Sequence, residues 1–434
     1  MQAKALPYAI DEAQKPSSVR WKIFLMMLFL ISINYIDRAS LSVAMPLIAK
    51  EFDIGPATQG LLLSGFFWTY AVMQIPGGML ADRFKPRIVI AAATLGWGFF
   101  QAAAAICTGW IGLFVTRLGL GAAEAPIYPA GGKLNAIWMT PNERGRGATL
   151  LDGGAPLGAA LGAILISALI AMLGSWRLAF VIAGAGTVLA GLFAWHYVRN
   201  EPRQHPGVNE AEARHIEDAH RIEDRSDPVN GSGRLLDFFR YRSVWGMFFG
   251  WMCFNSVFYG LLTWMPNYLY KVHGFDIKQM GGSTFLIFFS GFVGELFGGW
   301  LADKWKAAGG SPNRVMRTLF GIAAVIACAS IFSVAYVKDP VVVVGLLSVT
   351  LFFLRWCGLY WCIPTTLATR DKSGFLGGTM NLGGNIGGIL VPLLVGLIVQ
   401  STGSYFFALM FFAAAAVGLL VSSLAIDYSR KLPV

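Results

Sequence analysis

The chain has 434 residues, of which 56% are hydrophobic and 13% are charged, and its mean hydropathy is +0.58. Because soluble domains carry about 25% charged residues, this composition excludes an ordinary water-soluble protein and indicates one that spans a lipid bilayer. The net charge of +10 does not indicate a nucleic-acid-binding protein, because the cationic residues gather on one side of the predicted spans, as described below.

Apolar stretches long enough for a transmembrane helix, which needs about 20 residues, recur along the chain in two groups of six. The first group covers 23–45, 59–81, 88–107, 111–138, 147–173 and 178–198. The second group covers 243–268, 280–302, 317–337, 341–368, 374–400 and 404–426. The pattern predicts an all-α membrane protein with twelve transmembrane helices in two six-helix halves.

The polar segments complete this division. The predicted parts are a tail at 1–22, the first half at 23–198, a linker at 199–242, the second half at 243–426 and a tail at 427–434. The linker is charged and is bounded by Pro and Gly, and it contains one predicted short helix at 209–223. We expect this helix to lie along the membrane surface.

The distribution of Lys and Arg predicts the orientation in the membrane. Of the 34 Lys and Arg residues, 25 fall on one side of the predicted spans, counting Arg317 at the edge of its span, 5 fall on the other side and 4 lie within the spans. Cationic loops face the cytoplasm, so we expect both termini in the cytoplasm and the protein in the cell (inner) membrane. The first apolar stretch contains Asp37 and Arg38, which argues against a cleavable signal peptide.

An internal repeat supports the two-half architecture. GGMLADRFKPR (77–87) recurs as GGWLADKW (298–305), and GGAPLGAALGAIL (153–165) recurs as GGNIGGILVPLL (383–394). The offsets of 221 and 230 residues are about half the chain. Such repeats indicate two halves related by an axis along the membrane normal, with the substrate held between them near the midplane.

Charged residues inside the predicted spans indicate where the function lies, because ionisable side chains are costly in lipid and usually face a cavity. Arg117 and Glu124 are seven residues apart, which is two helical turns, so both lie on one helix face. Asp37 and Arg38 are adjacent in the first span. Arginine suits carboxylate binding, and a buried carboxyl can exchange a proton as its surroundings change. Either pair could instead be a structural ion pair.

The chain resembles the major facilitator superfamily through G-G-x-L-A-D-R after the second span and its weaker copy after the eighth. Within that superfamily it resembles the anion:cation symporter family. The residues that carry this likeness are NYIDRAS (34–40), FFWTYAVMQIPGG (66–78), RLGLGAAEAPIYP (117–129), LTWMPNYL (262–269) and NLGGNIGGILVP (381–392). The resemblance implies uptake of organic anions such as sugar acids, generally together with protons.

The resemblance also implies roles for individual residues. Asp37 and Glu124 match the proton-binding acids, Arg117 matches the ligand of the substrate carboxylate, and Arg38 matches a basic position beside the first acid. Four further residues match positions that hydrogen-bond to the substrate or pack on it: Tyr35, Tyr70, Trp361 and Asn381. Each of these four could instead belong to the core, with its polar tip satisfied there.

The chain departs from the family pattern at two positions. Ala155 stands where galactonate-type members have a glutamine, which weakens the case for a polyhydroxylated substrate. Arg355 is an additional cation in the second half, and we expect it to bind a second carboxylate of a dicarboxylic substrate. The alternative is that its side chain extends towards the extracellular surface. We expect Asp152, Glu295 and Lys133 to form gating or inter-half ion pairs.

Loop charges at the cytoplasmic ends of the second and eighth spans are candidates for a gate. Asp82 with Arg83, and Asp303 with Lys304, are expected to brace this gate when the carrier opens outward, because such charges form and break pairs between states.

These observations predict a proton-coupled symporter that imports an organic carboxylate by alternating access. The expected partners are a small carboxylate, protons and the lipid bilayer, and we expect a monomer. The sequence contains no catalytic constellation and indicates no metal or cofactor, so an enzyme is not expected. The main alternative is an anion exchanger without proton coupling; a drug-efflux pump and a transporter-like sensor have less support.

Overall fold

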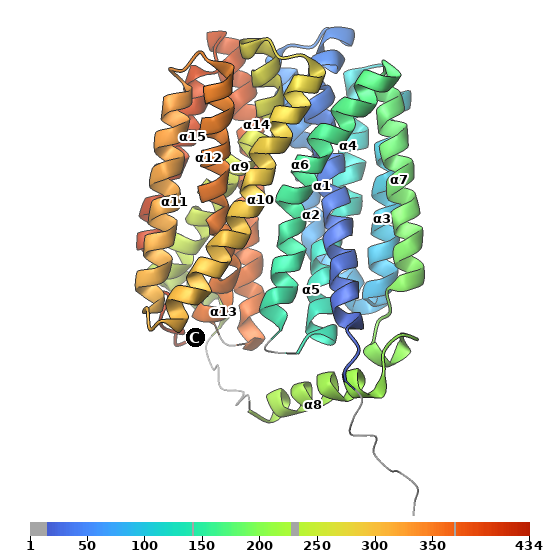
Figure 1. Ribbon diagram of the computed structural model, residues 1–434, viewed down its shortest axis with the longest axis vertical. Coiled ribbons are helices and arrows are strands. Elements are labelled where there is room, and N and C mark those ends of the chain that lie inside the picture. Colours follow the sequence, from blue (N-terminus) through green and yellow to red (C-terminus); the bar gives the residue numbers. More distant parts are fainter. Residues whose placement is uncertain (1–14, 141–142, 227–233, 369) are drawn as a thin grey trace, which may run out of the picture.

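The computed structural model describes residues 15–140, 143–226, 234–368 and 370–434, and within these ranges it contains fifteen α-helices and no strand (Figure 1). The first half comprises α1 (Val19–Glu51), α2 (Pro56–Phe84), α3 (Pro86–Ala103), α4 (Trp110–Glu124), α5 (Ile127–Trp138), α6 (Arg144–Leu173) and α7 (Trp176–Tyr197). The linker carries α8 (Glu210–Ser226). The second half comprises α9 (Arg242–His273), α10 (Ile277–Ala307), α11 (Pro312–Val334), α12 (Pro340–Leu354), the 3₁₀ segment η4 (Arg355–Cys362), α13 (Ile363–Leu367), α14 (Arg370–Thr402) and α15 (Phe406–Leu424).

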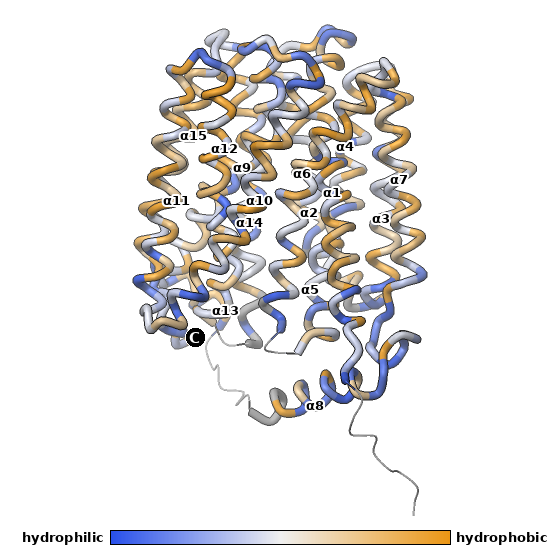
Figure 2. The backbone as a smooth tube through the Cα atoms, viewed as in Figure 1, coloured by the Kyte–Doolittle hydropathy of each residue, from blue (hydrophilic) through white to orange (hydrophobic). Residues whose placement is uncertain are grey.

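The bundle has the dimensions and surface of a membrane protein. Among the residues that the structure describes, nine helices are long and apolar enough to cross a bilayer. The helices α2 and α9, together with the consecutive pair α4 and α5, run beside them and complete the twelve segments (Figure 1). Hydrophobic residues cover the middle of the bundle and hydrophilic ones gather at its two ends (Figure 2). The twelve-helix architecture is therefore confirmed.

Two of the predicted spans are interrupted near their middle. The segment 111–138 is divided into α4 and α5 at Ala125 and Pro126, and the segment 341–368 is divided into α12, η4 and α13. Proline has no N–H to donate to the preceding turn, and its ring clashes with the carbonyl four residues earlier. Pro126 lies at the break between α4 and α5, whereas Pro364, the second residue of α13, accounts for the end of η4 but not for its start at Arg355.

We call the end of the bundle that carries α8 the linker end, and the opposite one the far end (Figure 1). At the far end the halves pack closely. The amide of Asn267 on α9 donates to Gln59 Oε1 on α2 at 3.0 Å. Gly60 approaches α14 so closely that a Cβ atom there would lie 2.5 Å from the carbonyl oxygen of Pro392. A Cβ atom at Gly281 would overlap Ser167 Oγ on α6. Glycines at these positions let the helices of opposite halves approach each other.

The linker helix is fixed to the first half. Glu212 is fully buried, and its carboxylate accepts hydrogen bonds from the backbone N–H groups of Val19 (3.1 Å) and Arg20 (3.2 Å). The Arg20 guanidinium binds both Glu212 at 2.7 Å and Glu143, which precedes α6, at 2.9 Å. The start of α1, the start of α6 and α8 thus share one ion-pair network.

Candidate functional site

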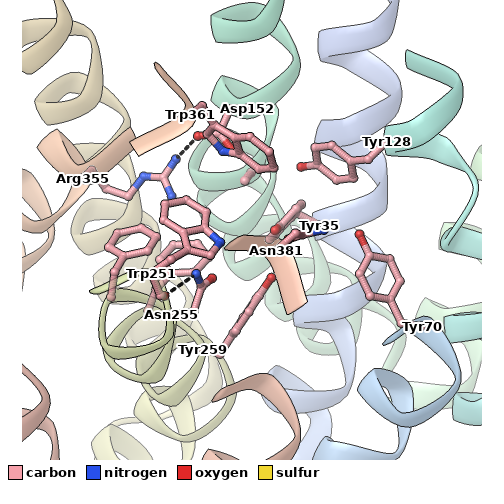
Figure 3. Close-up of a pocket in the computed structure, with 13 residues that line it drawn as sticks. Tyr35, Tyr70, Tyr128, Asp152, Trp251, Asn255, Tyr259, Arg355, Trp361 and Asn381 are labelled. Carbon is pink, nitrogen blue, oxygen red and sulfur yellow. Dashed lines mark hydrogen bonds and ion pairs between the residues drawn. The ribbon is translucent and has the colours of Figure 1, made fainter. Parts of the chain in front are cut away.

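A small cavity lies between the two halves near the middle of the bundle (Figure 3). The first half contributes Tyr35, Tyr70, Tyr128, Asp152 and Ala155 to its wall. The second half contributes Trp251, Phe254, Asn255, Phe258, Tyr259, Arg355, Trp361 and Asn381. The site is therefore rich in aromatic rings, phenol hydroxyls and amides, with Arg355 as a cation in its wall.

The structure brings five of the seven predicted substrate-binding residues into this wall, namely Tyr35, Tyr70, Arg355, Trp361 and Asn381. Arg38 does not line the cavity, because it lies behind the two tyrosines. Its guanidinium carbon lies 4.6 Å from the ring centroids of both Tyr35 and Tyr70, and 4.4 Å from that of Phe66. Cation–π contacts of this kind fix the position of a guanidinium. Arg38 is thus one side chain removed from the cavity.

Arg117 also lies outside the cavity wall in this conformation, whereas the sequence predicted that it binds the substrate carboxylate. Its guanidinium donates to the backbone carbonyl oxygens of Asp37 at 3.4 Å and of Arg38 at 3.3 Å. Nor does it form the ion pair with Glu124 that was considered as the alternative. Glu124 Oε2 instead accepts from Arg38 Nε at 2.8 Å, across the interface between α4 and α1. Arg117 therefore supports the backbone of α1 beside the charged pair.

The two predicted proton-binding acids are fully buried in the first half. Asp37 Oδ2 accepts a hydrogen bond from Thr187 Oγ1 on α7 at 2.8 Å. Within the described part of the chain, Asp37 Oδ1 and Glu124 Oε1 are buried without a hydrogen-bond partner. An unpaired carboxylate oxygen in such surroundings is costly, and a proton on it would lower that cost because it neutralises the buried charge. Both acids are therefore placed where a proton could bind.

Arg355 takes part in an ion-pair cluster that joins the halves. Its Nη2 atom lies 3.1 Å from Asp152 Oδ2 on α6 and 2.5 Å from Glu295 Oε2 on α10. The indole Nε1 of Trp361 donates to the other oxygen of Asp152, Oδ1, at 3.2 Å (Figure 3). The alternative in which Arg355 extends to the extracellular surface is wrong, because the residue is 2% exposed and bound to two carboxylates.

The 3₁₀ geometry of η4 explains why Arg355 and Trp361 face the same acid. With 3.0 residues per turn, positions 355, 358 and 361 lie above one another on one face. In an α-helix, with 3.6 residues per turn, a separation of six residues would direct the two side chains apart. Gly358, between them, leaves room for the cluster, since a Cβ atom there would lie 2.6 Å from Glu295 Oε1.

Sequence reasoning missed six residues of the cavity wall: Tyr128 on α5, and Phe254, Phe258, Trp251, Asn255 and Tyr259 on α9. A signal for the last three was present in the sequence. They are spaced four residues apart, so they form a polar and aromatic stripe on one face of an otherwise apolar helix.

The remaining predicted residues lie towards the linker end. The Arg83 guanidinium lies 5.4 Å from the Phe84 ring centroid, and Lys304 Nζ lies 4.8 Å from that of Trp300. Asp303 lies next to Lys304 on α10. The side chain of Asp82 lies outside the described residues. Lys133 donates to the backbone oxygen of Ala81 at 3.2 Å, a contact within the first half.

Comparisons with known proteins agree on one family. Residues 27–392 match the family described as the Major Facilitator Superfamily. The probable galactarate/D-glucarate transporter of Escherichia coli K12 is 29% identical over 97% of this chain and 96% of its own. The D-galactonate transporter of Escherichia coli O6:H1 is 31% identical over 93% of this chain and 94% of its own. A bacterial homologue of the human lysosomal transporter Spinster has the same fold, with a TM-score of 0.76, 19% identity and coverage of 96% and 100%.

Proposed function

Because the chain belongs to the Major Facilitator Superfamily, it is a multi-pass membrane transporter and not an enzyme, and we propose that it imports an organic carboxylate together with protons. The relatives named as galactarate, glucarate and galactonate transporters support a sugar acid or a similar organic acid as the cargo. The direction of transport, the coupling to protons and the identity of the acid are parts of this proposal.

The observation that carries the proposal is the buried contact between Arg38 and Glu124. It unites the cation that would bind an anion with the carboxyl that would bind a proton. Arg38 uses only Nε in this contact, and among the described residues its Nη1 and Nη2 atoms are buried without a partner. A carboxylate group fits this pair of donors because a guanidinium binds carboxylates through two parallel hydrogen bonds.

The coupling follows from competition for Arg38. When Glu124 is ionised, its charge holds the guanidinium behind Tyr35 and Tyr70. A proton on Glu124 removes that charge, which frees Arg38 to turn towards the cavity and bind the carboxylate of the substrate. Asp37, whose nearest described partner is the neutral hydroxyl of Thr187, is the second proton site. Proton and anion thus favour each other's binding, as symport requires.

The proposed cycle is alternating access. In the described arrangement the halves are packed together at the far end, through Gln59, Asn267 and the close approaches of Gly60 and Gly281. Rocking of one half against the other would open that end and close the linker end around the same cavity. We place the linker end, with both termini, in the cytoplasm of a cell whose inner membrane holds the protein, as a monomer.

The test is transport by purified protein in liposomes, with Glu124→Gln as the diagnostic variant. Wild-type protein should accumulate galactonate or galactarate when an inward proton gradient is imposed, and a protonophore should abolish the accumulation. Glu124→Gln should lose gradient-driven uptake by about tenfold or more, because one proton site carries a typical coupling of 1–3 kcal/mol, yet it should still exchange labelled for unlabelled acid. Glu217→Gln, on the linker surface, is the matched control and should behave as wild type.

The opposite outcome would support the alternative, an anion exchanger. If Glu124→Gln retains full uptake and a protonophore has no effect on the wild-type protein, the carrier has no proton coupling. If neither acid is bound or moved by the wild-type protein, the proposed cargo is wrong.

A further inference from the structure

The carboxylate of Asp152 is bound in the cavity wall in the manner of a ligand. Its Oδ2 atom meets Arg355 Nη2 at 3.1 Å, and its Oδ1 atom accepts from Trp361 Nε1 at 3.2 Å. Both donors belong to η4 in the second half, whereas Asp152 belongs to α6 in the first. The second half therefore presents a guanidinium and an indole N–H that together hold one carboxylate, and at present that carboxylate is supplied by the protein itself.

The donors are held in place without help from Asp152. Glu295, from the same half, binds Arg355 Nη2 at 2.5 Å, and the guanidinium carbon lies 5.0 Å from the ring centroid of Phe258. The 3₁₀ geometry fixes Arg355 and Trp361 on one face of η4. Arg355 Nε is buried without a hydrogen-bond partner in the described structure, so the guanidinium has a donor to spare.

Asp152 is the member of the cluster that is free to leave. Its side chain is 15% exposed, compared with 3% for Arg355 and 7% for Glu295, so it lies on the cavity side while Glu295 lies behind. The cluster contains one cation and two carboxylates, and a guanidinium already paired with Glu295 can give up one of its two anions without becoming unpaired. An incoming carboxylate could thus replace Asp152 with little change in the charge near Arg355.

We propose that Asp152 occupies the subsite for the second acid group of a dicarboxylic substrate, which binds Arg355 and Trp361 by displacing it. This assignment rests on the proposed function, in which Arg38 holds the first carboxylate. A monocarboxylic acid of the same length, ending in a hydroxyl group, would leave Asp152 in its place. The competition between Asp152 and the substrate then sets the preference between acids with one and two carboxylates.

The experiment compares two six-carbon acids, galactarate with a carboxylate at each end and galactonate with only one. Their dissociation constants are measured by calorimetry on the purified full-length protein. Asp152→Asn keeps the shape of the side chain and removes its charge, so it should shift the ratio of the two constants in favour of galactarate by about tenfold or more, the size expected for one charge-assisted hydrogen bond. Trp361→Phe removes an N–H donor that holds Asp152 before the displacement and the substrate carboxylate after it, so it should shift the ratio much less than Asp152→Asn does.

Glu51→Gln is a matched control. Glu51 also binds an arginine and an indole N–H, Arg177 at 2.6 Å and Trp176 at 2.7 Å, but all three lie in the first half at the far end, remote from the cavity. This variant should leave the ratio unchanged. Galactonate binding by each variant shows that it is folded.

An unchanged ratio in Asp152→Asn, in a protein that still binds galactonate, would overturn the assignment while leaving the proposed function intact. Weaker galactarate binding in that variant would overturn it too, because Asp152 would then assist the diacid instead of competing with it. If the wild-type protein binds neither acid, the proposed function fails and the assignment falls with it.

Discussion

Arg38 shows how one side chain can serve two partners in turn. It is buried among three aromatic rings, it is paired with Glu124 through Nε, and its two terminal nitrogens have no partner among the described residues. A lysine at this position would keep the positive charge but would lose the planar fork and the stacking of the guanidinium on the rings. The positive charge holds Glu124 in place, whereas the planar pair of terminal N–H donors is what the carboxylate of the substrate requires.

The variant Arg38→Lys should therefore weaken substrate binding without destabilising the folded protein. We expect the affinity for the transported acid to fall about tenfold or more, since a bidentate carboxylate contact is lost, while the thermal unfolding midpoint changes little. Arg87→Lys is the control, because Arg87 also lies over an aromatic ring, at 4.3 Å from the Trp195 centroid, but belongs to the exposed linker end. Calorimetry that shows wild-type affinity in Arg38→Lys would mean that the anion binds elsewhere.

The charged residues of the site could be predicted from the sequence, but their pairing could not. Charges inside apolar stretches are conspicuous, so Asp37, Arg38, Arg117 and Glu124 were found at once. The spacing of Arg117 and Glu124 shows that they share a helix face, yet it does not show which neighbouring helix that face meets. In the structure it meets α1, and Arg38 takes the place beside Glu124 that Arg117 could have had.

At the scale of helices, the two halves are interrupted at equivalent places. The fourth span of the first half breaks after Glu124, the last residue of α4, and the fourth span of the second half breaks at Arg355, the first residue of η4. Each break thus lies beside a charged residue of the proposed site. Hydropathy predicted both spans but neither break, because it measures how apolar a stretch is and does not distinguish an α-helix from a 3₁₀ segment.

The start of α1 depends on a residue far away in the sequence. The first N–H groups of a helix have no partner within it, and Ser18, which precedes α1, provides no side-chain cap. The carboxylate of Glu212 on α8 fills this role instead.

Glu143 belongs to the same ion-pair network. Burial would raise the pKa of Glu143, but hydrogen bonds from Arg20 and Thr140 outweigh the effect of burial and lower this pKa below its usual value. The carboxyl group of Glu143 therefore stays ionised until the pH falls through that lowered pKa.

Glu212→Gln should destabilise the protein by about 1–3 kcal/mol, because it removes a buried charge that accepts several hydrogen bonds and leaves Arg20 less well paired. Glu210→Gln is the control on the same helix. The Glu210 side chain is half exposed and pairs with Arg203 and Arg214, and such surface pairs contribute about 0–1 kcal/mol. Thermal unfolding of the two variants in detergent tests this difference. Equal midpoints would show that the capping of α1 by α8 has no role in stability.

At the scale of the whole molecule, the number of spans, the two halves and the linker followed from composition, hydropathy and the internal repeat. The conformation could not be derived in this way, because closure of one end depends on contacts between helices of different halves. Gly281 is an example. Nothing in the sequence of α10 shows that Gly281 meets Ser167 of α6 while its neighbour Gly282 has open space beside it.

This neighbouring pair of glycines gives a test of the rocking motion. Valine at Gly281 would collide with α6 and hinder closure of the far end, at a cost of about 1–3 kcal/mol, which displaces the conformational equilibrium by roughly tenfold or more. Gly281→Val should transport about tenfold more slowly and show faster hydrogen exchange in residues 54–64 and 390–400. Gly282→Val, the matched control, should leave both unchanged. If the amides at the far end are as well protected from hydrogen exchange in Gly281→Val as in the wild type, closure does not depend on this contact.

The attachment of α8 to the first half has a practical consequence. Two contacts fix this helix to the first half: Glu212 binds the start of α1, and His220 lies 3.0 Å from the backbone oxygen of Met139. We therefore expect α8, which lies outside the membrane, to move together with the first half. A donor dye at Asp218, which is exposed on α8, and an acceptor at Arg314, near the start of α11, would lie on opposite sides of the moving interface. The carrier would then convert the arrival of an organic acid into a change of fluorescence, and serve as an optical sensor for it.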